Sequence, residues 1–198
     1  MKSHLLLGAF VMLVCTSLTA WSQEPRFLTV SGGYSFVNIE DTDLKGTGFR
    51  ANVLYQGIEQ DKPFAHGYAI GYIMVTASRD SLLPKVNPLA TQEQMTIDYT
   101  VSSVPLYYAP MYTFGGGAIK GFVKGAVGLQ FAWITRKASN TKFSDTDLGF
   151  YGGASAGILI PLNEKIVISA EYEWAYASNS FYHDGFMNSA MAGLRFAL

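Results

Sequence analysis

The sequence is poor in charge and in cysteine, and it lacks long apolar runs. Only 15% of its 198 residues are Asp, Glu, Lys or Arg, whereas a soluble domain has about 25%. The formal net charge is −1, so nothing favours nucleic acid and we expect no nucleic-acid partner. After Cys15 there is no uninterrupted run of about 18 apolar residues, which argues against a helical membrane protein.

The first residues have the pattern of a secretory signal peptide. A short polar start is followed by an apolar run, and Ala20 and Ser22 form a small-x-small cleavage site. We expect residues 1–22 to be removed, with cleavage after Ala20 as the alternative. Cys15 would leave with this leader, so the mature chain, residues 23–198, would have no disulfide.

Aromatic residues are abundant, with 13 Phe, 12 Tyr and 3 Trp. Past the leader, apolar and polar residues alternate along eight segments. In the clearest one the even positions are all apolar, and the odd positions include Glu171 and Glu173. A strand places alternate residues on opposite faces. We therefore predict strands at 26–37, 46–58, 64–77, 95–114, 118–136, 148–160, 165–177 and 186–198.

The connectors between these segments alternate between long and short. Outer-membrane barrels have this pattern, with short periplasmic turns and longer extracellular loops. A β-sheet in lipid must also close into a barrel, because each unpaired backbone amide costs several kcal/mol. We predict an all-β, closed, eight-stranded, antiparallel up-and-down transmembrane β-barrel. We expect it to be a monomer in the bacterial outer membrane, with both termini periplasmic and with lipid and lipopolysaccharide around it. The long connectors are Asn38–Lys45, Ser78–Glu93, Lys137–Asp147 and Ser178–Gly185.

Two further patterns concern the strand ends and the fourth segment. Aromatic residues near strand ends would form girdles at the two membrane interfaces. Pro105 and Pro110 interrupt the fourth segment, and a bulge there would reverse which residues face inward. The prolines would also weaken strand pairing and permit a lateral opening. The girdle residues would be Phe27, Tyr55, Phe114, Trp133, Trp174, Tyr176 and Phe196.

Five charged residues fall on the inward parity of their strands. An eight-stranded barrel is only wide enough to be filled by its own side chains, and buried charges must be paired. We expect a lumen charge network that fills the barrel, with a narrow gated polar path as the alternative. The residues are Arg50, Lys124, Glu171, Glu173 and Arg195.

Several stretches resemble the small outer-membrane β-barrel domain family, which includes porin-family proteins. They are Val104–Leu106, Tyr112–Phe114, Gly115–Gly117, Val123–Leu129 and the closing Gly193–Phe196. The resemblance implies the barrel fold, the outer-membrane location and insertion by the outer-membrane assembly machinery. It does not choose an activity. We expect a non-enzymatic structural or surface role in adhesion, recognition or envelope integrity.

An enzymatic alternative comes from a second resemblance. Lipid A deacylases of similar size use a His-x-Ser-Asn stretch, and here Tyr176 stands at the histidine position before Ser178 and Asn179. A serine without its histidine is not activated, although His183 follows in the next connector. We therefore predict no catalytic residue. We also predict no metal site and no cofactor, because the two histidines of the mature chain have no partner at a ligand spacing.

Overall fold

The computed structural model describes residues 25–40, 44–58, 62–82, 94–138 and 141–198. The predicted signal peptide and its cleavage site lie outside these residues. No helix in the described ranges is long and apolar enough to cross a bilayer.

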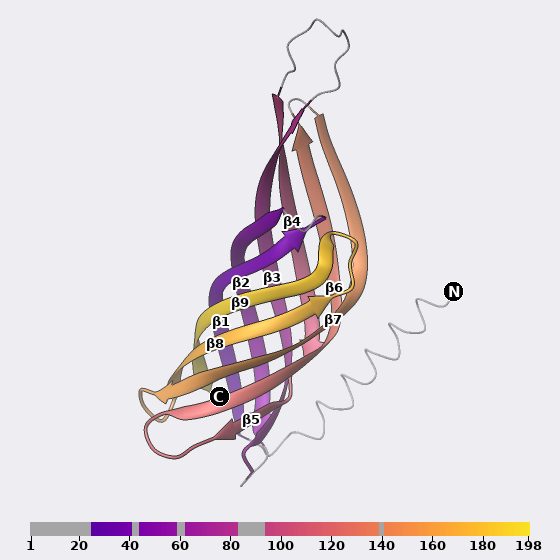
Figure 1. Cartoon of the computed structure of the whole chain (residues 1–198). Helices are drawn as coiled ribbons and strands as arrows, with labels where there is room; N and C mark the ends of the chain where they lie inside the picture. Colours follow the sequence, from indigo (N-terminus) through magenta and orange to yellow (C-terminus); the bar gives the residue numbers. More distant parts are fainter. Residues whose placement is uncertain (1–24, 41–43, 59–61, 83–93, 139–140) are drawn as a thin grey trace, which may run out of the picture.

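The described chain is almost entirely antiparallel strand, rolled into a closed ring (Figure 1). Neighbours in sequence pair with one another around the ring. The first and last strands also pair, from Phe27 with Ala197 up to Val37 with Met187. The predicted all-β, eight-stranded barrel is confirmed. Its strands are β1 (Arg26–Ile39), β2 (Lys45–Ile58), β3 (Phe64–Leu82), β4 (Gln94–Tyr108), β5 (Met111–Phe114), β6 (Lys120–Ala138), β7 (Thr141–Pro161), β8 (Ile166–Ala177) and β9 (Tyr182–Ala197).

Segments β4 and β5 form one strand of the ring, because both pair with β3 on one side and β6 on the other. Their register is unchanged across Pro110, and the Pro110 carbonyl still accepts the Gly125 N–H at 2.8 Å. No bulge therefore shifts the parity of this strand. Pro105 faces inward, and the β3–β4 pairing lapses beside it, between Ile70–Leu106 and Ile73–Ser103.

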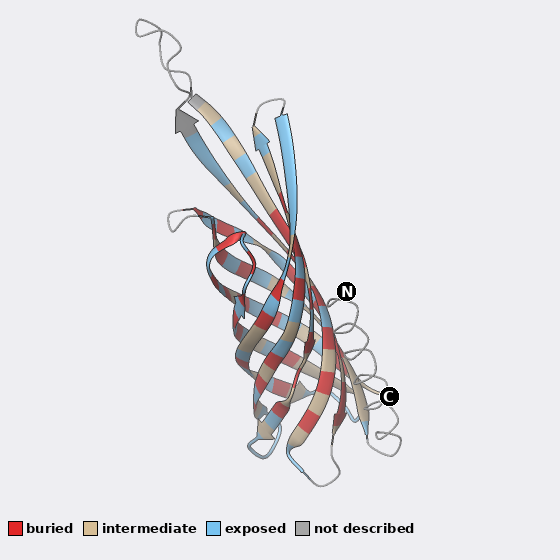
Figure 2. Cartoon of the chain, turned by 90° about the vertical axis from the view of Figure 1, so that its right-hand side faces the viewer, coloured by how far each residue is buried: buried red, intermediate tan, exposed pale blue. Residues whose placement is uncertain are grey.

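The two faces of the ring differ in chemistry, as the alternating red and blue bands of Figure 2 show. Outward positions are apolar and exposed, such as Val127 at 50% and Leu194 at 44%. Polar and charged side chains are buried inside, including Arg50 and Lys124. A soluble barrel places its apolar face inward. This barrel has the opposite arrangement, with its apolar face outward.

Two hairpins continue well beyond the ring, which corrects the predicted strand ends (Figure 2). The predicted connector Lys137–Asp147 is mostly strand, because β6 and β7 stay paired up to Ala138 and Thr141. Strand β3 likewise runs to Leu82 and pairs with Gln94 at the start of β4. Strands β4 and β6 also pair along this length. Together the four strands form a protruding sheet, here called the extension, which comprises 77–82, 94–99, 134–138 and 141–148.

Aromatic residues line both ends of the outer wall. Near the extension, the Phe49 and Tyr72 ring centroids lie 5.6 Å apart, and Tyr72 is 6.2 Å from Trp133. At the opposite end, where short turns join the strands (here called the turn end), His66 packs edge-on against Phe64, with the ring centroids 4.8 Å apart. One predicted girdle residue is misplaced, because Phe27 lies on the inward parity of β1 and packs inside the barrel.

Candidate functional site: the barrel interior

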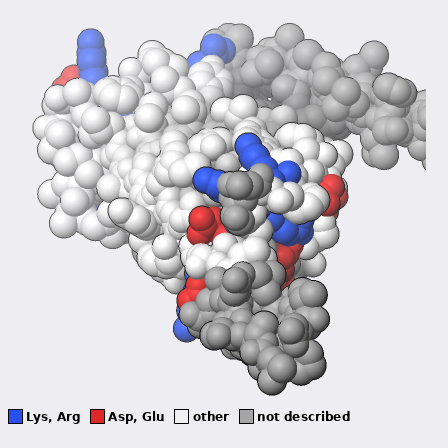
Figure 3. All heavy atoms as spheres, turned by 90° about the horizontal axis from the view of Figure 1, so that it is seen from above, with Lys and Arg blue, Asp and Glu red and all other residues white. Residues whose placement is uncertain are grey.

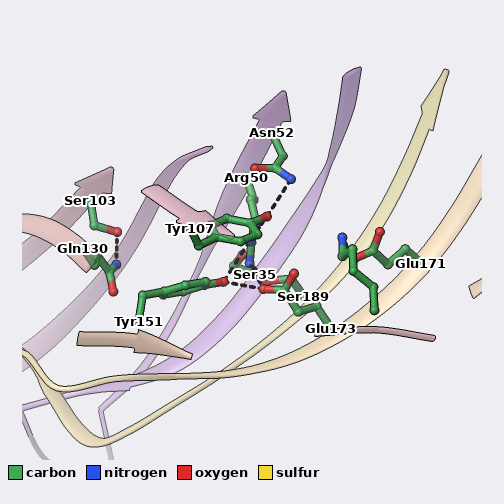
Figure 4. A network of polar contacts seen from close by, with 11 residues as sticks. Ser35, Arg50, Asn52, Ser103, Tyr107, Gln130, Tyr151, Glu171, Glu173 and Ser189 are labelled. Atoms are coloured by element: carbon green, nitrogen blue, oxygen red, sulfur yellow. Dashed lines mark hydrogen bonds and ion pairs between the residues drawn. The ribbon is translucent and has the colours of Figure 1, made fainter. Parts of the chain in front are cut away.

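Arg50, on β2, is the centre of the interior polar network (Figure 4). Its side chain is completely buried, and its Nη1 donates to Glu173 Oε1 at 2.6 Å. Its Nη2 donates to the Tyr151 hydroxyl at 2.9 Å. The Tyr151 hydroxyl in turn donates to the same Glu173 oxygen. Strands β2, β7 and β8 are thus joined across the barrel through one ion pair and one shared tyrosine.

Neutral groups extend this network around the ring. Asn52 Nδ2 donates to the Tyr107 hydroxyl at 2.8 Å. The hydroxyls of Ser35 and Ser189 lie 2.7 Å apart. The Tyr107 and Tyr151 rings pack with their centroids 5.2 Å apart. These bonds stabilise the layer, since an unsatisfied polar group in the interior costs about 1–3 kcal/mol.

Lys124, on β6, and Glu171, on β8, form a second ion pair. Lys124 Nζ lies 2.5 Å from Glu171 Oε1, with side-chain exposures of 2% and 10%. Register places Glu171 one inward step from Glu173 along β8. The interior therefore holds two ion pairs that share one strand, and four of the five predicted charges take part in them.

Arg195, the fifth predicted residue, does not join this network. It is buried on β9, but its guanidinium carbon lies 4.3 Å from the centroid of the Phe27 ring. The expectation that Arg195 would meet Arg50, Glu171 and Glu173 is wrong. Inward parity put all of them inside the barrel, but Arg195 sits nearer the turn end, where Phe27 pairs with Ala197.

Apolar side chains close the interior at the end that carries the extension. Ile39 is fully buried, and Phe181 and Tyr182 are 3% exposed. Ile39 pairs with Tyr182, and the Glu40 N–H donates to the Phe181 carbonyl at 3.1 Å. Glu40 also forms an ion pair with Arg136 on the extension. The sequence reasoning missed this closure because these residues lie in or beside connectors predicted to be loops.

The residues of the enzymatic alternative, Ser178 and His183, contact different partners and not one another. Ser178 Oγ accepts the Phe150 N–H at 2.8 Å, and His183 Nδ1 lies 3.3 Å from the Glu40 carbonyl oxygen. Within the described ranges no hydrogen bond joins Ser178 to His183, so the geometry shows no activated serine. The same ranges contain no group of three or more His, Cys, Asp or Glu residues placed to hold a metal ion.

Solved structures with the same architecture match the chain over most of its length. Neisserial surface protein A superposes with a TM-score of 0.60 at 11% identity, over 87% of this chain and 97% of that one. A major outer membrane protein from Thermus thermophilus gives a TM-score of 0.54 at 12% identity, over 88% and 99%. The chain has the fold of the small eight-stranded outer-membrane β-barrels.

This outer-membrane barrel fold is compatible with more than one activity. The outer membrane protease OmpT from Escherichia coli also superposes, with a TM-score of 0.50 at 8% identity, over 89% of this chain and 98% of that one. No protein-family model matches the sequence. No curated protein matches it either. The role of this barrel has to be argued from its own residues.

Proposed function

We propose that this chain is an integral protein of the bacterial outer membrane, with a closed interior and a non-enzymatic role at the cell surface. One observation carries this proposal: the wall is apolar outside and holds ion-paired charges inside. Val127, Leu129 and Phe131 are each more than 40% exposed on one strand, whereas Lys124 and Gln130 on that strand are buried. An exposed apolar area on this scale is typical of a surface that contacts lipid.

The filled interior favours a structural or recognition role over transport. The Arg50–Glu173 and Lys124–Glu171 pairs occupy the middle of the barrel. Apolar side chains around Phe181 lie above them, and an apolar cluster around Phe122 lies below. A barrel of eight strands has little space left once these side chains fill it. The charges then act as a plug.

The extension supplies the surface for recognition. Viewed from above, charged side chains gather around the protruding hairpins, and most of the barrel wall in view is uncharged (Figure 3). Outer-membrane barrels expose their long connections on the cell surface. We infer that the extension faces outward, with both termini in the periplasm, and that it contacts macromolecules outside the cell. Its charged residues include Arg79, Asp80, Asp98, Arg136, Lys137, Lys142 and Asp145.

Site-specific labelling in cells tests location and orientation together. Cys15 is the only cysteine, so a Cys15→Ala background allows one new cysteine at a time. Lys142→Cys places it on the exposed extension, and Gly116→Cys places it in a turn with open space around it. Both substitutions lie on exposed backbone and serve as matched partners.

A membrane-impermeant maleimide should label Lys142→Cys in intact cells, and Gly116→Cys only after the outer membrane is permeabilised. The protein should sediment with the outer membrane and change its gel mobility on boiling. Labelling of Gly116→Cys alone in intact cells would show that the barrel has the opposite orientation. A soluble protein without a heat-dependent mobility shift would refute the proposal as a whole.

The non-enzymatic part of the proposal is tested through lipid A. Mass spectrometry of lipid A from cells with and without the protein should give the same acyl pattern, since Ser178 is not paired with His183. Loss of an acyl chain that disappears in Ser178→Ala would show a hydrolase instead.

A further inference from the structure

We propose that the turn end of the barrel contains an oxyanion-binding pocket built on Arg195, which takes a small carboxylate or phosphate from the aqueous phase. The pocket is separate from the two interior ion pairs. The inference rests on the geometry around Arg195 and does not depend on which membrane the barrel occupies.

The first observation is that one edge of the Arg195 guanidinium lacks a partner. The residue is 96% buried, because only 4% of its surface is exposed. Among the described residues, nothing accepts a hydrogen bond from Nε or Nη2. These two nitrogens form the edge that donates two parallel hydrogen bonds to one carboxylate or phosphate. The groups left unpaired are therefore the pair that recognises an oxyanion.

The second observation is that the guanidinium is held in place without being neutralised. Its carbon lies 4.3 Å from the centroid of the Phe27 ring. Such stacking fixes the plane of the group and leaves its edges available. Arg50 and Lys124, the other buried cations of the interior, each have a carboxylate partner within 2.6 Å. A lone buried charge is costly unless something pairs with it.

The third observation is a pocket of about 330 Å³ that Arg195 lines. Lys120 also lines it, and no Asp or Glu stands among its described lining residues. Most of the remaining wall is apolar, from Phe27, Ile58, Leu159 and Val167. A ligand that fits has an anionic head against Arg195 and a short apolar body. A medium-chain carboxylate matches this description.

Nuclear magnetic resonance of the arginine side chains tests the pocket directly. The mature chain, labelled with ¹⁵N-arginine and folded in a phosphate-free non-ionic detergent, would be titrated with hexanoate, acetate and inorganic phosphate. Arg195→Gln identifies the Arg195 Nε–H resonance. We expect that resonance alone to shift saturably, with hexanoate effective at a concentration at least tenfold lower than acetate.

Two substitutions distinguish the effect of the two parallel guanidinium donors from the effect of positive charge alone. Arg195→Lys keeps the positive charge but removes the two parallel donors, so hexanoate affinity, followed by calorimetry, should fall at least tenfold. Lys165→Gln removes an exposed charge in the turn next to the pocket, outside its lining, and should leave affinity unchanged. The heat-dependent gel shift of each variant verifies that the barrel is folded.

Three results would refute the proposal. One is a titration in which none of the probes shifts the Arg195 resonance saturably. Another is equal affinity in the folded Arg195→Gln variant. The third is a loss in Lys165→Gln as large as in Arg195→Lys, which would indicate unspecific attraction. If bicelles of phosphatidylglycerol shift the Arg195 resonance and block hexanoate, the phosphate comes from a lipid headgroup and the aqueous source is wrong.

Discussion

Arg50 Nη1 and Glu173 Oε1 lie 2.6 Å apart, although the two residues are 123 positions apart in the sequence. Both side chains are shielded from solvent, and Tyr151 bridges them. A buried pair of this kind adds little net stability over an apolar pair of the same size, but a single broken partner is expensive. The pair therefore makes the registers of β2 and β8 depend on one another.

Replacing Glu173 by Gln should destabilise the folded barrel by about 3–5 kcal/mol, because Arg50 would remain buried without its counter-charge. Urea unfolding in lipid vesicles, followed by tryptophan fluorescence, measures the change. The double variant Arg50→Met with Glu173→Leu should recover most of the loss. If the double variant is as unstable as the sum of the two single variants, the two charges do not act as a pair.

Planar bilayers should show no discrete conductance steps for the folded protein, since the two ion pairs and the apolar side chains around Phe181 block the middle and the far end of the barrel. Glu171→Gln should leave the protein non-conducting and lower its stability, because it removes the partner of Lys124. Conductance steps that change size in Glu171→Gln would mean that the interior is a narrow polar path.

Asp147 links the β8–β9 connector to β7. Its carboxylate accepts hydrogen bonds from the Ser180 N–H at 2.8 Å and from the Ser180 hydroxyl at 2.9 Å. These bonds lower the pKa of the Asp147 carboxyl below its ordinary value. The stabilisation is therefore complete above the unfolded pKa, about 4, and is lost as the pH falls through the lower folded value.

The Ser180 amide resonance should accordingly titrate with a midpoint below about 3.9, the ordinary value of an aspartate. In Asp147→Asn the same resonance should show no such step. A midpoint above the ordinary value would contradict the anchoring role of Asp147.

Pro105→Val restores an N–H beside Gly71, where the β3–β4 pairing lapses. One more ladder hydrogen bond should stabilise the barrel by about 1 kcal/mol, in part offset because the unfolded chain gains freedom when proline is lost. Solute uptake by cells should not change. A clear fall in uptake in Pro105→Val would mean that the β3–β4 seam serves as a lateral opening.

Alternation identified the residues inside the ring because one face of each strand in the ring is exposed and the other is buried. Arg50, Lys124 and Glu173 were found in this way. The same signal fails in the parts of the extension that were predicted as connectors, because residues 78–80 and 141–146 are all exposed and neither face is buried. No contrast between faces exists there, so strands were mistaken for loops.

The position of a residue along the barrel axis was harder to predict than whether its side chain faces inward or outward. Which inward charges meet depends on how far each strand is staggered against its neighbours, and parity does not contain that information. Arg195 was therefore grouped with Glu171 and Glu173, although it lies beside Phe27. Phe27 was misplaced for a related reason, because the glycines in β1 weaken its alternation.

The pairing of β1 with β9 has a consequence for the order of events in folding. Phe27 meets Ala197, so nearly all of the described chain separates the two residues that seal the ring. Contacts of such long range are slow to form, and until they form both edge strands are open to pairing with other chains. The chain therefore remains prone to association with other chains until its last strand has paired with its first.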